Sequence, residues 1–184
     1  MYLLKQIYNK SRHLDDMYIY QFVNKKWLLN EVIQVKNGKG LFEFVQSRPI
    51  QLDYAIIKIN QPYRNILYHF YPHIKIIIDK HEIIALFNTL MGEAQDVYEE
   101  VAVSIEQRCH AEYFNGDIRF FIHDFYHMQS KTEAIAFYEL WQKDLPINDK
   151  KISKFVRVME FYSDEIINYF DSNRGTISVF TDEC

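Results

Sequence analysis

The chain has few cysteines, few glycines and prolines, and no long hydrophobic run. Cys109 and Cys184 show no metal-type spacing in 184 residues, so we expect two reduced thiols. Five glycines and four prolines beside 48% apolar residues exclude a collagen-like or disordered chain. No apolar run approaches the roughly 20 residues of a membrane helix, and a signal-peptide pattern is missing at the N-terminus. We therefore expect a globular, cytoplasmic protein that does not bind membranes.

The chain also lacks the excess of positive charge that is typical of proteins holding DNA by its phosphates. It has 21 Lys and Arg against 25 Asp and Glu, a formal net charge of −4. This balance disfavours a dedicated DNA-binding protein. Acidic residues concentrate at 93–106 and 164–171, so a local basic face elsewhere is compatible with the total.

The segment 53–91 organises the predicted fold. Residues 55–59 and 74–78 are short β-branched runs, each followed by helical spacing, and a connection of one helix makes the two strands parallel. Upstream, the pattern predicts strands at 2–8, 17–23 and 27–35 and a short helix at 41–48. The order of three strands, helix, strand, helix, strand and helix predicts an α/β protein with an RNase H-like mixed sheet.

From residue 80 onward the spacing is helical. It predicts helices at 83–108, 118–128, 132–143 and 152–170. We predict an RNase H-like α/β core over residues 1–109. A C-terminal helical extension over residues 110–184 packs on it, and the two form a single compact domain.

Short motifs spread over the chain follow a definite order. They are Gln61-Pro62-Tyr63-Arg64, Tyr71-Pro72-His73-Ile74-Lys75, Ile78-Asp79-Lys80, then Trp141 and Pro146, and finally Ile166-Ile167-Asn168-Tyr169-Phe170 with Ser172-Asn173. This order resembles the DDE transposases of the ISL-three group of bacterial insertion sequences. The resemblance implies a truncated transposase, without the family's zinc-binding segment and helix-turn-helix.

The resemblance also implies where three catalytic acids belong. It places Lys5-Gln6, Lys58 and Ile177 at those positions, while Pro62, Tyr63, Asp79 and Asn173 retain the family motif. DDE chemistry needs three carboxylates converging on two divalent ions, and a fixed ammonium charge opposes metal binding. We therefore expect no catalytic residue, no cofactor and a pseudo-transposase.

Other acidic residues and two histidines are weaker candidates for chemistry. The acids Asp15, Asp16 and Asp53 are predicted at strand beginnings, which we take to be the wrong ends for a catalytic site. Asp79 precedes a helix, where an N-cap is the alternative to a catalytic role. His123 and His127 have the i, i+4 spacing of zinc ligands, but further ligands are needed, and a partly buried polar helix face is the alternative.

The helices of the second half contain more aromatic residues than one packing stripe requires. We predict Phe121, Tyr126 and Tyr138 as interaction residues, with core packing or stacking on bases as alternatives. We expect a regulator or inhibitor of a mobile element that works through a protein partner. A residual, weakly binding DNA-binding domain, a homodimer, and an active DDE transposase or nuclease with displaced acids are the alternatives.

Overall fold

The chain forms two compact units, Met1–Asp79 and Lys80–Cys184. The computed structural model describes residues 1–9, 14–48, 50–91, 118–144 and 150–170. Strands occur in the first unit, and the described part of the second unit is helical, so the chain is a mixed α/β protein. The predicted boundary between residues 109 and 110 lies outside the described residues.

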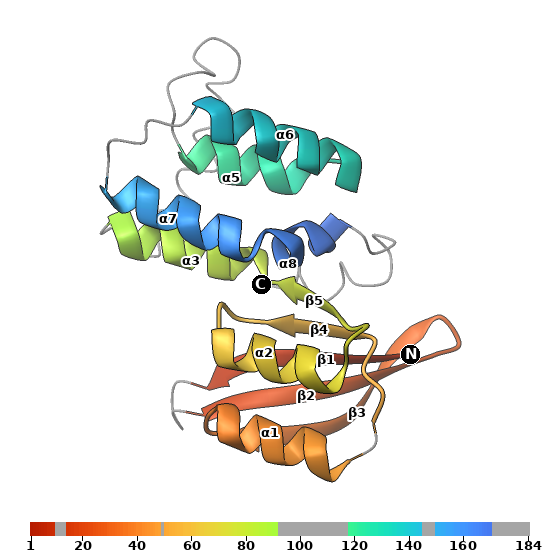
Figure 1. Cartoon of the computed structure of the whole chain (residues 1–184). Helices are drawn as coiled ribbons and strands as arrows, with labels where there is room; N and C mark the ends of the chain where they lie inside the picture. The colour runs from red at the N-terminus through yellow and green to blue at the C-terminus, as the bar shows by residue number, and fades with distance from the viewer. Residues whose placement is uncertain (10–13, 49, 92–117, 145–149, 171–184) are drawn as a thin grey trace. The chain divides into compact units, whose positions relative to one another are not determined.

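The first unit contains a five-stranded mixed sheet. Its strands are β1 (Tyr2–Asn9), β2 (Leu14–Val23), β3 (Lys26–Val35), β4 (Tyr54–Ile57) and β5 (Lys75–Ile78). Their order across the sheet is β3-β2-β1-β4-β5, with β1, β2 and β3 antiparallel and β1, β4 and β5 parallel (Figure 1). The predicted parallel pair and the predicted hairpin are therefore confirmed.

A tight turn joins β2 to β3. Asn24 and Lys25 have φ values of 50° and 63°, and positive φ at both central residues is the signature of a type I′ turn. This turn matches the right-handed twist of the flanking strands. The register shifts by one residue between Ile19 and Tyr20, as a β-bulge does.

Two helices, α1 (Gly38–Ser47) and α2 (Gln61–Phe70), cover one face of this sheet (Figure 1). Asn37 caps α1 by accepting a hydrogen bond from Gly40 N at 3.2 Å. The core between the helices and the sheet is apolar. Apolar residues recur along the strands and helices at the spacing that places them on the facing surfaces. Its members include Leu4, Met17, Ile19, Val35, Leu41, Val45, Ala55, Ile57, Leu67, Ile76 and Ile78.

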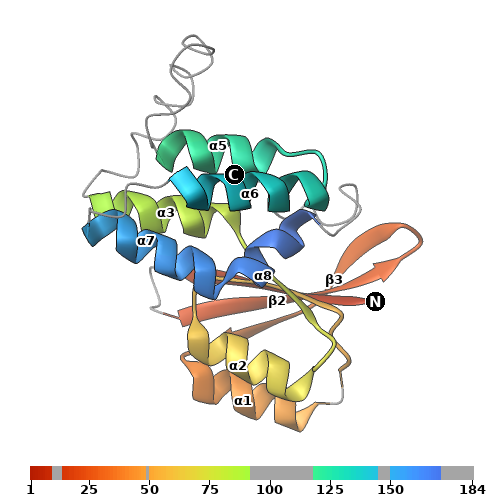
Figure 2. The same ribbon diagram turned by 45° about the horizontal axis from the view of Figure 1, so that its top comes forward.

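The second unit consists of α3 (Lys80–Met91), α5 (Ile118–His127), α6 (Lys131–Asp144), α7 (Lys150–Phe161), α8 (Ser163–Ile167) and a 3₁₀ turn (Asn168–Phe170) (Figure 2). Helix α3 packs beside α7, and α5 packs beside α6. The predicted helix 83–108 is described only as far as residue 91. Within the described residues, no helix combines the length and the apolar character that crossing a bilayer requires.

The prediction of one continuous helix over residues 152–170 is wrong, because the helix is interrupted at Tyr162. That residue has φ −108° and ψ 19°, outside the helical range, and α8 starts at the next residue. Ser163, Asp164 and Glu165 then form the first turn of α8, where polar and acidic side chains are favoured by the helix dipole. The apolar periodicity continues across the break, which is why the sequence pattern does not show it.

Candidate functional site

The carboxyl ends of the parallel strands define the edge where an RNase H-like catalytic site would lie. Strands β1, β4 and β5 end at this edge, and β2 begins there because it runs antiparallel to β1. Register pairs Tyr8 with Asp15 and Ile7 with Asp16 across β1 and β2. Asp15 and Asp16 lie at the beginning of β2, as predicted, but this beginning is at the carboxyl edge of the parallel strands, so the prediction that they lie at the wrong end is wrong.

Gln6 and Lys58 occupy this edge on neighbouring parallel strands. Gln6 is buried, and its Oε1 accepts a hydrogen bond from Lys58 N at 3.0 Å. Lys5 of β1 pairs with Ile56 in register, and Lys58 directly follows the end of β4, two residues after Ile56. At the positions where the resemblance requires acids, the chain therefore has Lys5, Lys58 and the Gln6 amide, and that amide accepts a backbone hydrogen bond.

Asp15 and Tyr63 form a hydrogen bond between the sheet and α2. The Tyr63 hydroxyl donates to Asp15 Oδ2 at 2.7 Å, and Tyr63 itself is buried. Asn60 holds the start of α2 by accepting a bond from Tyr63 N at 3.1 Å, with Pro62 in the same first turn. Burial, together with this bond and the negative charge of Asp15, raises the pKa of Tyr63 well above its ordinary value of 10.

The other two acids considered as substitutes have structural partners. Asp16 is buried, and its Oδ1 accepts a hydrogen bond from Gln34 Nε2 at 3.2 Å. Asp53 lies before β4, at the opposite edge from the carboxyl ends, as predicted, and its Oδ2 accepts a bond from Tyr2 N at 2.7 Å. Neither carboxylate therefore converges with Asp15 on a shared position.

The residues at this edge do not fit a pair of divalent ions. Such ions need several carboxylate oxygens around one point. Across the described ranges, no group of three His, Cys, Asp or Glu is placed to hold a metal ion. Asp79 directly precedes α3, and Ile177 and Asn173 lie outside the described residues.

His123 and His127 stack on one face of α5, with ring centroids 4.2 Å apart. Each Nδ1 is engaged within the helix: His123 Nδ1 lies 3.0 Å from Asp124 Oδ1, and His127 Nδ1 lies 2.7 Å from the carbonyl oxygen of His123. Asp124 is thus the third polar group of this face. The arrangement is that of the polar helix face named as the alternative to a zinc site.

Two of the three predicted interaction residues lie in the core of the second unit. Phe121 is 3% exposed and Tyr138 is 7% exposed, so these two assignments are wrong. The physical reason is ring packing between α5 and α6, where Phe121 stacks on Trp141 with centroids 3.8 Å apart. Tyr126 is half-buried and lies edge-on to Tyr169 at 5.1 Å.

The surface that sequence reasoning missed lies on the sheet. We call it the aromatic face: Tyr18, Tyr20 and Phe22 of β2 with Trp27, Leu29 and Val32 of β3. Register pairs Tyr18 with Val32, Tyr20 with Leu29 and Phe22 with Trp27, so all six lie on one face. Alternation of aromatics along residues 18–22 was the available signal.

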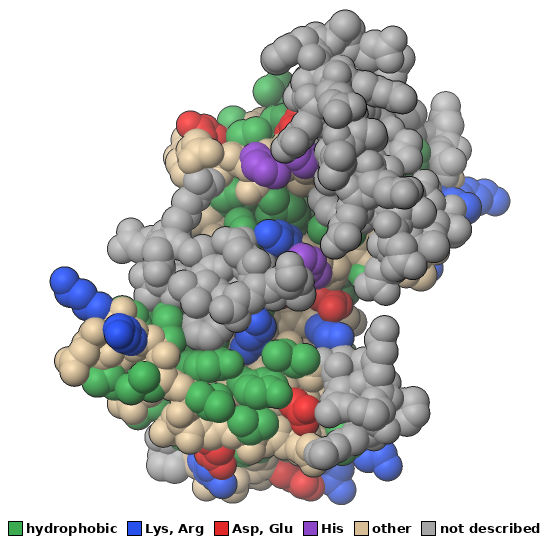
Figure 3. Space-filling view, turned by 180° about the vertical axis from the view of Figure 1, so that it is seen from behind, with side chains coloured by type: hydrophobic (Ala, Val, Ile, Leu, Met, Phe, Trp, Pro, Cys, Tyr) green, Lys and Arg blue, Asp and Glu red, His purple; other side chains and the backbone are tan. Residues whose placement is uncertain are grey.

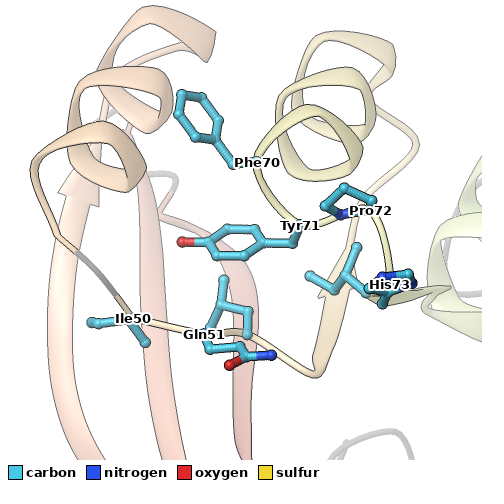
Figure 4. A pocket seen from close by; sticks show the side chains of 8 residues that line it. Ile50, Gln51, Phe70, Tyr71, Pro72 and His73 are labelled. Carbon is cyan, nitrogen blue, oxygen red and sulfur yellow. The ribbon is translucent and has the colours of Figure 1, made fainter.

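A shallow hollow of about 280 Å³ lies at the opposite, amino-terminal edge of the parallel strands (Figure 4). It is bordered mainly by apolar side chains, among them Ile50, Leu52 and Ile74, and by Tyr71, whose pKa burial raises. Asp and Glu side chains do not contribute to its lining. Tyr71 and His73 are therefore the titratable side chains of this lining, and no carboxylate accompanies them there.

Removal of the Tyr63 hydroxyl should change how stability depends on pH. Above about pH 10 an unfolded chain releases its tyrosine protons while folded Tyr63 keeps its own, so the unfolded state binds fewer protons and the free energy of unfolding falls as pH rises. The expected slope from this residue is up to about 1.4 kcal/mol per pH unit. Tyr63→Phe should remove that slope and, at pH 8, lower the unfolding free energy by about 1–2 kcal/mol.

Urea unfolding followed by circular dichroism at pH 8 and pH 10.5 measures both effects. Tyr54→Phe, in the same unit, is the matched control at both pH values. An unchanged pH slope in Tyr63→Phe would contradict the role assigned to the bond with Asp15.

No protein-family model, curated protein or solved structure matches this chain. The transposase resemblance therefore stays a prediction based on short motifs. Of these, Pro62 and Tyr63 lie in the first turn of α2, and Asp79 lies between β5 and α3.

The two units differ in charge. Residues 1–79 contain 11 Lys and Arg against 6 Asp and Glu, and residues 80–184 contain 10 Lys and Arg against 19 Asp and Glu.

Proposed function

We propose that this chain is a catalytically inactive relative of an insertion-sequence transposase that acts by binding. The strand order β3-β2-β1-β4-β5, with three antiparallel strands followed by two parallel ones, supports an RNase H-like sheet. Helices α1 and α2 follow β3 and β4, as in the order predicted from the sequence. Fold alone does not carry a function, so the proposal depends on the catalytic edge.

One observation carries the proposal: the catalytic edge is built from groups that satisfy each other. Gln6 accepts from the backbone of Lys58, and Asp15 accepts from the Tyr63 hydroxyl. Phosphodiester cleavage by paired metal ions instead needs carboxylates whose oxygens face the ions. Lys5 and Lys58 add positive charge beside that position, which opposes a divalent cation.

A protein without catalytic residues acts by binding other molecules. We propose that this chain binds a protein partner and thereby regulates or inhibits a mobile element. Exposed apolar side chains in both units support a binding role, because apolar patches on a protein surface mark contact sites. They include Leu29 and Val32 on β3, Leu140 on α6 and Phe161 on α7. Residual nucleic-acid binding is the second candidate, and the excess of cationic residues in the first unit favours it.

Metal-dependent nicking of supercoiled plasmid DNA tests the absence of catalysis. We expect no cleavage above the protein-free blank with Mg²⁺ or Mn²⁺ over the time in which one turnover would be seen. Mn²⁺ titration followed by electron paramagnetic resonance should show no saturable site. Mn²⁺-dependent nicking that Asp15→Ala abolishes would refute the proposal and identify a displaced acid.

A further inference from the structure

The aromatic face presents a row of rings along neighbouring strands. Tyr18 and Tyr20 are nearly parallel, with an interplanar angle of 19° and centroids 6.5 Å apart, and Phe22 lies 5.0 Å from Trp27. These four rings are half-buried, so part of each is open to solvent. Leu29 and Val32 beside them are exposed by 53% and 45%.

This face is turned away from α1 and α2. Tyr63 of α2 bonds to Asp15, and Asp15 lies on the same strand as Tyr18 at an odd separation, so the two side chains point to opposite faces of the sheet. Hydrophobic side chains gather on the side of the molecule seen from behind, with both Lys or Arg and Asp or Glu side chains next to them (Figure 3). The rings therefore form a surface that these two helices do not cover.

Positive charge borders the aromatic row. Lys25 and Lys26 are exposed at the hairpin turn next to Trp27, and Lys5 pairs in register with Tyr18. The one carboxylate that register places on this side of β2 is Asp16, which is buried and accepts from Gln34. A second copy of the chain docked through this face would bring like charges together, whereas an anionic partner would complement them.

We propose that the aromatic face binds single-stranded nucleic acid, with bases stacked on its rings and phosphates near its lysines. Tyr18 and Tyr20 are separated by 6.5 Å, about twice the 3.4 Å between successive bases in one strand of B-DNA. Rings at this separation accept the bases of an extended, unstacked strand, and not those of a closed duplex. Every base has a π-face, so the binding is sequence-tolerant.

This inference rests on the second candidate function, residual nucleic-acid binding, and names the surface and the form of nucleic acid for it. Phosphates alone would need only the lysines, and an anionic lipid surface would need only lysines with apolar side chains. The paired strands hold the rings at a fixed spacing, and neither of these ligands requires that spacing. Base stacking does use it.

Intrinsic fluorescence offers a local probe, because the chain has two tryptophans, Trp27 and Trp141. The full-length Trp141→Phe protein reports on Trp27 alone, and we expect saturable quenching by a 15-nucleotide oligo-deoxythymidine. Fluorescence anisotropy of the labelled oligonucleotide with the unaltered protein gives the affinity independently, including when Trp141→Phe does not fold.

Ring removal should weaken this affinity. Tyr18→Ala and Phe22→Ala are each expected to reduce it about 5-fold to 140-fold, which corresponds to the loss of one base-stacking ring. Phe42→Ala is the matched control, because Phe42 is an exposed aromatic residue on α1 in the same unit. The combined change Lys25→Gln and Lys26→Gln should lower the slope of log K against log salt by up to about 1.4, since each phosphate contact on a single strand contributes about 0.7.

Heparin and phosphatidylserine vesicles are the competing ligands in the same assays. Binding of the oligonucleotide that the ring variants weaken and Phe42→Ala does not weaken supports the proposal. Equal binding of heparin and oligonucleotide with no effect of Tyr18→Ala or Phe22→Ala overturns it, as does binding of vesicles alone. The absence of oligonucleotide binding in low salt would also overturn the proposal. This holds equally if the ring variants then alter only self-association or contact with another protein. A protein that nicks plasmid DNA and also binds the oligonucleotide through these rings would refute the proposal of a catalytically inactive protein. It would leave the proposed binding site standing.

Discussion

Replacing Phe121 with alanine is expected to lower the free energy of unfolding of the second unit by about 3–5 kcal/mol. The side chain is 3% exposed and stacks on Trp141, Phe125 and Phe137, with centroids 3.8 Å, 5.3 Å and 5.6 Å away. Truncation leaves a cavity among rings that cannot close it, so transfer and cavity costs add. A loss of this size would unfold a marginally stable unit.

Chemical denaturation followed by near-ultraviolet circular dichroism measures this loss, because the tyrosine and tryptophan rings around Phe121 contribute the signal. Phe161→Ala is the matched control, since Phe161 is 48% exposed on α7, and we expect a change within about 0.5 kcal/mol. A Phe121→Ala protein as stable as the control would show that the ring lies at a surface. It would also restore the interaction role that burial argues against.

Replacing Asp53 with alanine is expected to lower the free energy of unfolding by about 2–3 kcal/mol. Its carboxylate accepts from Tyr2 N at 2.7 Å, its N–H donates to Tyr2 O at 3.0 Å, and its carbonyl accepts from Lys75 N at 3.0 Å. Asp53 therefore joins the starts of β1, β4 and β5. Without the carboxylate, the Tyr2 N–H loses a charge-assisted partner at a partly buried strand end.

Asp53→Asn separates the hydrogen bond from the charge, because an amide oxygen still accepts from Tyr2 N. We expect it to cost about 1 kcal/mol, with the same thermal and urea unfolding measurements. Glu43→Ala is the surface control, since the Glu43–Lys39 pair is exposed and 3.7 Å long. A stable Asp53→Ala protein with altered ligand binding would instead make Asp53 a site residue.

Local signals decided much of the first unit. The β-branched runs, the polar turn at Asn24 and Lys25, and the helix after Lys36 all appear where the pattern predicts them, because strand alternation, turn chemistry and capping act over a few residues. Parallel pairing of β4 and β5 followed from the length of the connection between them. The break at Tyr162 was missed because apolar spacing continues through it.

Sequence spacing by itself determined which segments form strands and helices and that two strands run parallel, because those properties depend on neighbouring residues. Tertiary structure decided which groups meet. The direction of β2 brings Asp15 to the carboxyl edge and to the Tyr63 hydroxyl, 48 residues away, which no local pattern encodes. The burial of Phe121 and the partial exposure of the aromatic face were likewise decided by which elements pack against each of them, since an aromatic side chain packs equally well in a core or against a partner.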